Sequence, residues 1–223
     1  MILRIEKTAL IIFAREPELG KVKTRLQKDL PKDKILRLYK AFLRDVLSLA
    51  ERIRCGTKNI YYTGTGSIKF LARFKNKFGY VKQSSGDLGE RMHQAFCLSR
   101  KSGAERTVII GTDCLEIVEE DIQDAFTRLS SHDVVLGPSC DGGYYLIGLK
   151  KPIKGLFINM PWGTPGVLEA TLRRIKKMRK KVFLLNEKSD IDTFSDLMRI
   201  CRVPNFKKVA PHSWKIIRDD KIC

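Results

Sequence analysis

The sequence lacks the long apolar segments that mark membrane and secreted proteins. In its 223 residues no apolar run approaches the roughly 20 residues that a membrane span needs. Charges interrupt the N-terminal stretch, whose apolar part is typical of a strand, so a signal peptide is not expected. We therefore expect a cytoplasmic protein.

Cysteine and histidine are scarce. The six cysteines form no C-x-x-C pair and follow no regular spacing, which favours reduced thiols over a disulfide framework or a zinc site. With three histidines, a His-rich metal centre is not expected. The cysteines are Cys55, Cys97, Cys114, Cys140, Cys201 and Cys223.

Acidic residues are few compared with basic ones. There are 25 Asp and Glu against 43 Lys and Arg, for a net charge of +18, which favours an anionic ligand. The densest basic cluster, Arg173 to Lys181, lies on a predicted helix and its end, where a solvated face is the usual explanation. No RNP, zinc-finger or helix-turn-helix pattern accompanies it, so nucleic acid is not the expected partner.

The pattern of apolar residues predicts an α/β fold. Buried strands alternate with amphipathic helices, which is typical of a mainly parallel sheet with right-handed crossovers. We predict a single domain over residues 1–203 and a basic C-terminal extension over residues 204–223. The predicted strands cover residues 9–14, 59–63, 80–83, 107–110, 133–137, 144–149 and 182–185. The predicted helices cover residues 33–54, 69–78, 119–129, 164–177 and 192–201, with Asp33 capping the first, and a further helix follows the loop at residues 83–92 and extends to about residue 100.

A cationic loop follows the first strand. The segment Arg15–Gly20 contains a proline and a glycine and leads into the sequence KVKTR. Such a loop at the carboxyl end of a buried strand is where α/β folds hold anions. Its fixed charges, Arg15, Lys21, Lys23 and Arg25, suggest a polyphosphate rather than a carboxylate. The loop is neither a P-loop nor a G-x-G-x-x-G fingerprint, so a solvated surface loop is the alternative.

Carboxylates follow later strands. Asp113 stands directly beyond the strand at 107–110, where a divalent cation could bridge it to phosphates, although it could instead cap the next segment. Asp190 and Asp192 precede the last predicted helix. Asp192 could be that helix's N-cap, which would leave Asp190 to face the crevice.

Two glycine-containing motifs admit two interpretations each. Asp141-Gly142-Gly143 joins two strands and could be a plain hairpin turn, but two glycines also let the backbone approach a sugar or base. The segment Gly86–Arg91 could combine a helix cap with salt bridges, but its glycines also suggest close approach to a ligand.

These segments, taken in order, resemble one family. The motifs AREPELGKVKTRL, QSSGDLGERM, IIGTDC, VVLGPSCDGGYYLIGL, MPWGT and DIDTFSDL are similar to those of the bacterial and archaeal DUF2064 group, from about residue 8 to 200. These are predicted glycosyltransferases of the GT-A type. The resemblance implies a three-layer α/β/α Rossmann-like GT-A fold, the nucleotide-diphospho-sugar transferase fold. Relatives include the guanylyltransferases of coenzyme F420 and molybdenum-cofactor synthesis.

The resemblance also implies roles for individual residues. Mg²⁺ or Mn²⁺ would be held by Asp113, Asp190 and Asp192. Asp113 would be catalytic through the metal. Apart from the resemblance, an inverting reaction would need a general base near the acceptor hydroxyl, for which Asp141 and Asp87 are the candidates. Residues expected to contact the nucleotide or its phosphates are Arg15, Gly20, Lys21, Lys23, Thr24, Arg25, Gln83, Gly86, Arg91, Gly142 and Gly143.

The sequence departs from the family pattern at three points. Leu115 and Phe194 stand where the family usually has proline, and Asp113 is a single acid rather than part of an Asp-x-Asp motif. The first hypothesis is a metal-dependent glycosyltransferase with a nucleotide-diphosphate sugar donor and an unknown acceptor. A nucleotidyltransferase that joins an NTP to a phosphorylated metabolite and releases pyrophosphate is the second. A non-catalytic anion- or RNA-binding protein is the third.

Overall fold

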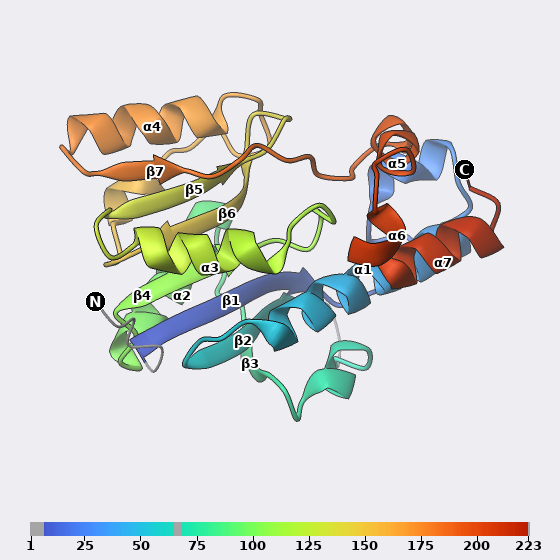
Figure 1. Cartoon of the computed structure of the whole chain (residues 1–223), viewed down its shortest axis with the longest axis horizontal. Coiled ribbons are helices and arrows are strands. Elements are labelled where there is room, and N and C mark those ends of the chain that lie inside the picture. The colour runs from blue at the N-terminus through green and yellow to red at the C-terminus, as the bar shows by residue number, and fades with distance from the viewer. Residues whose placement is uncertain (1–6, 65–67, 223) are drawn as a thin grey trace.

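One mixed sheet forms the centre of the molecule (Figure 1). The computed structural model describes residues 7–64 and 68–222. The sheet has seven strands in the order β3-β2-β1-β4-β6-β5-β7. Neighbouring strands are parallel, except that β6 runs antiparallel to both β4 and β5. The strands are β1 (Thr8–Arg15), β2 (Thr57–Thr63), β3 (Gly79–Lys82), β4 (Arg106–Ile110), β5 (Val134–Pro138), β6 (Tyr144–Leu149) and β7 (Val182–Leu184).

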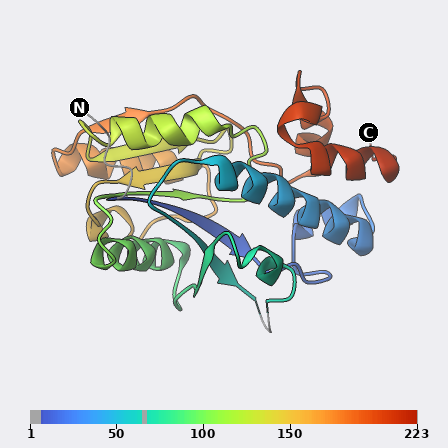
Figure 2. The same cartoon turned by 60° about the horizontal axis from the view of Figure 1, so that its bottom comes forward.

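Helices cover both faces of the sheet, and Figure 2 shows α2 on the face opposite to α1 and α3. The predicted three-layer α/β fold is therefore confirmed. Within the described residues, no helix is long and apolar enough to cross a membrane. The helices are α1 (Lys32–Arg52), α2 (Leu88–Lys101), α3 (Glu119–Arg128), α4 (Val167–Lys177), α5 (Phe194–Ile200), α6 (Phe206–Val209) and α7 (Pro211–Asp219).

Strand β1 contributes side chains to two hydrophobic cores, one on each face of the sheet. Leu10 and Ile12 pack on the side of α1 and α3, whereas Ile11 packs with Phe96 of α2 on the other side. These strand residues are fully buried because both faces of the sheet carry helices. This burial explains the continuous apolar run in the sequence and fixes the carboxyl end of β1 in space.

The helix predicted over residues 69–78 is wrong in its length. Only the 3-10 turn Leu71–Phe74 forms there. The buried carboxylate of Glu16 accepts hydrogen bonds from the backbone N–H groups of Phe70, at 2.6 Å, and Leu71, at 3.1 Å. The Tyr80 hydroxyl donates to the Leu71 carbonyl oxygen at 2.6 Å. These tertiary contacts hold the segment in a compact turn instead of a longer helix.

Two helix starts also differ from their predictions. Helix α1 begins at Lys32 with Pro31 in the N-cap position, so Asp33 lies in the first turn rather than at the cap. Helix α4 begins at Val167 instead of residue 164, because Thr164 turns back and donates its hydroxyl to the Pro161 carbonyl oxygen at 2.8 Å.

The C-terminal segment packs on α1. Helices α6 and α7 contribute Phe206 and Ile217 to the core cluster that contains β1 and α1, and Figure 1 shows α7 beside α1. The buried Asp45 carboxylate of α1 accepts from the backbone N–H groups of His212, at 3.0 Å, and Ser213, at 2.8 Å. The extension predicted over residues 204–223 is therefore helical and partly buried, while the domain boundary at residue 203 stays a prediction.

The cysteines do not all match the expectation of reduced thiols. Cys55, Cys97, Cys114 and Cys140 are free. Cys201 is disulfide-bonded, so the expectation is wrong for this residue. Cys223 lies outside the described residues.

We predict that Asp45→Ala destabilises the chain by about 2 kcal/mol, because it leaves two N–H groups in the first turn of α7 without an acceptor. Urea unfolding followed by circular dichroism measures the loss. Asp124→Asn is the control, since Asp124 forms an exposed pair with Arg128. Equal stability of the two variants would show that α7 is not held by Asp45.

Candidate active site

A cleft of about 470 Å³ opens at the carboxyl ends of β1 and β4. Its walls come from the loop after β1, the loop after β4 and the segment before α5, with the first residues of β6 closing one side. This edge of the sheet is where open α/β folds bind ligands. The predicted site residues that line it are Arg15, Lys23, Thr24, Arg25, Gln83, Arg91, Asp113, Asp190 and Asp192.

The Lys23 ammonium lies between two of the predicted metal ligands. Its Nζ is 2.6 Å from Oδ1 of Asp113 and 3.0 Å from Oδ1 of Asp192, and its side chain is only 5% exposed. Burial lowers the pKa of this ammonium, but the two carboxylates more than offset the effect and raise the pKa above its ordinary value. Lys23 is therefore a charged, buried bridge between the carboxylates.

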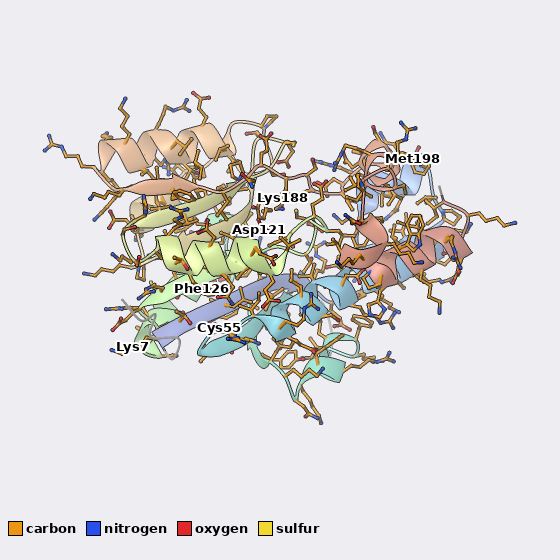
Figure 3. All side chains as sticks on the ribbon, in the orientation of Figure 1. Lys7, Cys55, Asp121, Phe126, Lys188 and Met198 are labelled. Atoms are coloured by element: carbon orange, nitrogen blue, oxygen red, sulfur yellow. The ribbon has the colours of Figure 1, made fainter. Side chains whose placement is uncertain are left out.

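The late acidic segment is held in place by contacts with the loop after β4. The Ile191 backbone N–H donates to the carbonyl oxygen of Asp113 at 3.0 Å. Glu116 accepts from the Ser189 N–H at 2.8 Å. Lys188 pairs with Asp121 of α3 at 3.0 Å, and Figure 3 shows these two side chains close together between the sheet and α5. The segment is thus fixed to the edge of the sheet.

Asp190 faces the cleft without a bonded partner. Within the described residues, its carboxylate takes part in no hydrogen bond or ion pair. Burial, followed by the nearby Asp113 and Asp141 charges, raises the pKa of the Asp190 carboxyl to about 7. A buried carboxylate beside other carboxylates needs a further positive charge to stay ionised at neutral pH.

The donor set fits a hard divalent cation. Carboxylate oxygens are the ligands that Mg²⁺ and Mn²⁺ prefer, and Mg²⁺ commonly takes one or two carboxylates plus substrate phosphates. Among residues 7–64 and 68–222, no three His, Cys, Asp or Glu side chains converge as a metal site. The cation would therefore take Asp113 and one further carboxylate, Asp190 or Asp192, and share the rest of its coordination with a ligand.

Three arginines also line the cleft, namely Arg15, Arg25 and Arg91. Arg15 donates through Nη1 to the Lys21 carbonyl oxygen at 2.9 Å, and the Tyr39 hydroxyl bonds to the Arg15 backbone at 3.2 Å. The Arg25 side chain is 66% exposed and is 3.4 Å from Asp192. Arg91 donates to Oε1 of Gln83 at 3.1 Å. Arginines and carboxylates thus line the same cleft, an arrangement that suits a phosphate with a bound metal ion.

Comparison with known proteins identifies the family. The model described as "Uncharacterized protein conserved in bacteria (DUF2064)" matches residues 46–164. The chain belongs to the DUF2064 family. The resemblance inferred from the motifs is therefore confirmed. Among curated proteins, none matches the sequence.

Many solved structures are similar to this chain. A predicted nucleotide-diphospho-sugar transferase from Desulfovibrio desulfuricans G20 is 30% identical, with a TM-score of 0.85 over 97% of this chain and 96% of that one. The inositol-1-phosphate CTP transferase from T. maritima is 14% identical, with a TM-score of 0.53 over 97% and 98%. A cytidylyltransferase from Leptospira borgpetersenii is 14% identical, with a TM-score of 0.53 over 96% and 95%. The last two show the fold alone.

Several residues predicted to act in the site of this DUF2064 chain do not line the cleft. Lys21 pairs with Glu18 at 2.8 Å. Asp87 caps α2 by accepting from the Glu90 N–H at 2.8 Å, as the capping interpretation predicts. The residues outside the cleft lining are Gly20, Lys21, Gly86, Asp87, Asp141, Gly142 and Gly143.

The turn at residues 139–143 lies beside the cleft. Oδ1 of Asp141 accepts from the Gly143 N–H at 2.9 Å, so the hairpin-turn interpretation holds. The Asp141 charge nevertheless reaches Asp190, where it contributes to the raised pKa. Gly142 has a φ of 85°, and a Cβ there would overlap the backbone of Pro165. The glycine is needed for packing as well as for the turn.

Sequence reasoning missed the uncharged walls of the cleft. Tyr39 comes from α1, and burial, followed by the Asp113 charge, raises the pKa of its hydroxyl to about 12. Tyr144 packs edge to face on Trp162. Phe13 and Thr63 stand near strand ends, a position that could have marked them. The additional lining residues are Phe13, Ala14, Val22, Tyr39, Thr63, Leu88, Gly111, Thr112, Cys114, Tyr144 and Tyr145.

We predict a pH-dependent stability gain in Asp190→Asn. The folded pKa of about 7 lies above the ordinary 3.8, so wild-type stability falls as pH rises from 4 to 7, and the penalty is complete above 7. The variant should be more stable than wild type at pH 8 by on the order of 2 kcal/mol, and the difference should shrink towards pH 5. Thermal unfolding at both pH values tests this, with Asp124→Asn as the control. A difference that does not change with pH would contradict it.

A pair of glycine substitutions separates packing from backbone strain. Gly142 and Gly163 both have positive φ, at 85° and 78°, but a Cβ at Gly163 would meet nothing within 4 Å. We predict that Gly163→Ala costs about 1 kcal/mol, and that Gly142→Ala costs about 2 kcal/mol more because of overlap with Pro165. Urea unfolding of both variants measures the difference. Equal losses would mean that the turn adapts to the methyl group.

Proposed function

We propose that this DUF2064 protein is a metal-dependent glycosyltransferase that uses a nucleotide-diphosphate sugar as its donor. One observation carries the proposal: a cleft at the carboxyl edge of the sheet is lined by both carboxylates and arginines. A diphosphate with a bound divalent cation complements both kinds of group. The 30% identity to a predicted nucleotide-diphospho-sugar transferase over nearly the whole chain supports the same class.

The carboxylates and arginines have separate tasks in this proposal. Asp113, together with Asp190 or Asp192, would hold the cation, which, when bound, supplies a Lewis acid to the donor's diphosphate. Arg15 and Arg25 offset the negative charge that grows on the departing nucleotide diphosphate as the glycosidic bond breaks. Such fixed charges contribute roughly 3 kcal/mol or more to transition-state stabilisation.

An inverting reaction also needs a base for the acceptor hydroxyl. Of the two sequence candidates, Asp141 fits better than Asp87. The Asp141 side chain lies in the turn beside the cleft and its charge acts on Asp190, whereas the Asp87 carboxylate caps α2. We propose Asp141 as the group that accepts the acceptor's proton.

Nucleotidyl transfer is the second candidate, because two nucleotidyltransferases of known structure have a similar fold. The inositol-1-phosphate CTP transferase and the cytidylyltransferase share the fold over nearly their whole length. The same arginines and carboxylates would suit an NTP, with the phosphate of a second substrate attacking the α-phosphorus and pyrophosphate leaving. Fold alone does not separate the two reactions. Ligand preference does.

The test is thermal unfolding of wild type and Asp113→Asn with NTPs and nucleotide sugars, each with and without Mn²⁺. A ligand at about 100 times its Kd stabilises the fold by about 2.7 kcal/mol. We expect a Mn²⁺-dependent shift with one nucleotide sugar in wild type and none with Mn²⁺ in the variant, which should also lose turnover. Asp124→Asn should behave as wild type.

Other outcomes assign other functions. A metal-dependent shift with a bare NTP, together with pyrophosphate release, would replace glycosyl transfer by nucleotidyl transfer. No shift with any nucleotide would contradict both, and tight RNA binding with a steep salt dependence would then support the binding-protein hypothesis.

A further inference from the structure

The Lys23 ammonium has a complete shell of acceptors. Its three hydrogens face Oδ1 of Asp113 at 2.6 Å, Oδ1 of Asp192 at 3.0 Å and the Ile191 carbonyl oxygen at 2.5 Å. The Phe42 ring lies on a further side, 5.9 Å from Nζ to its centroid. In this arrangement Lys23 has no hydrogen left for a phosphate, although it comes from the predicted phosphate-binding loop.

The three oxygens around Lys23 are those that a hard metal ion takes. Two carboxylates and a backbone carbonyl are common ligands of divalent cations in proteins. The unpartnered Asp190 carboxylate lies in the same cleft. The ammonium therefore occupies an oxygen-lined position that would suit a divalent cation equally well.

We infer that Lys23 is a tethered cation that exchanges with the divalent cation. Without metal it neutralises Asp113 and Asp192. When a divalent cation binds these oxygens, the ammonium leaves them and turns to the phosphates in the cleft. This inference rests on the proposed function for its metal and phosphate, and it assigns Lys23 two successive partners.

The backbone around Lys23 permits this exchange by side-chain movement. Lys23 adopts a left-handed conformation, with φ 44° and ψ 48°, which a non-glycine residue holds only at a cost. Val22 and Leu26, on either side, are buried in the core and anchor the segment. The chain can therefore keep its path, with the left-handed conformation at Lys23, while the flexible lysine stem moves.

The first experiment measures Mn²⁺ binding without nucleotide, from the electron paramagnetic resonance signal of free Mn²⁺. Lys23→Met removes the competing charge and keeps an apolar stem. We expect it to bind Mn²⁺ at least ten-fold more tightly than wild type. Lys28→Met is the matched control, because Lys28 is an exposed lysine of the same segment, and its affinity should stay within two-fold. Unchanged or weaker binding by Lys23→Met overturns the exchange.

The second experiment needs no variant. Acetic anhydride labelling of wild type, read by mass spectrometry, follows the reactivity of each lysine. Lys23 should react slowly alone, several-fold faster with saturating Mn²⁺, and slowly again with Mn²⁺ plus pyrophosphate, while exposed Lys28 should stay unchanged. Constant labelling of Lys23 under Mn²⁺ overturns the exchange even if Lys23→Met binds metal tightly, because a charge effect at a distance would then explain the affinity. Failure of pyrophosphate to restore protection overturns the phosphate step.

These results are separable from the proposed function. Metal exchange at Lys23 without a response to any nucleotide would leave the inference standing for the metal step and contradict the transferase. A nucleotide-specific shift without Mn²⁺ binding in either wild type or Lys23→Met would retain a transferase and overturn the exchange.

Discussion

A single buried ammonium keeps the acidic edge of the sheet together. Carboxylates repel one another when several enter a partly buried cleft, and burial raises the cost of each charge. Lys23 joins Asp113, which follows β4, to Asp192, which precedes α5. The cationic loop, the central strand and the late acidic segment can therefore share one edge of the sheet.

The site is a product of tertiary structure rather than of any one motif. Its carboxylates come from the loop after β4 and from a segment beyond β7. The Ile191–Asp113 backbone hydrogen bond links these two segments. Glu116 and the Lys188–Asp121 pair anchor the same segment from the side of α3. The position of the side chains that would contact a ligand thus depends on hydrogen bonds and an ion pair outside the cleft lining.

Hydrophobic patterning predicted the sheet well because a strand buried on both faces, such as β1, leaves a continuous apolar run in the sequence. The end of a predicted strand then located Asp113, and the start of the last predicted helix located Asp190. Contacts between side chains from distant parts of the sequence could not be predicted in the same way. Nothing local indicates that the Lys23 ammonium turns towards carboxylates, that Glu16 shortens the helix expected near residue 70, or that Tyr39 of α1 reaches the cleft.

The reversed direction of β6 brings a separate segment of the chain to the cleft. Because β6 runs against β4, its first residues, rather than its last, stand at the ligand edge, and the turn before it comes with them. The cationic loop after β1 and the carboxylates of the cleft belong to other segments of the chain. If the proposed transfer reaction holds, acceptor preference can therefore change through the turn and the start of β6, without loss of the groups proposed to hold the donor.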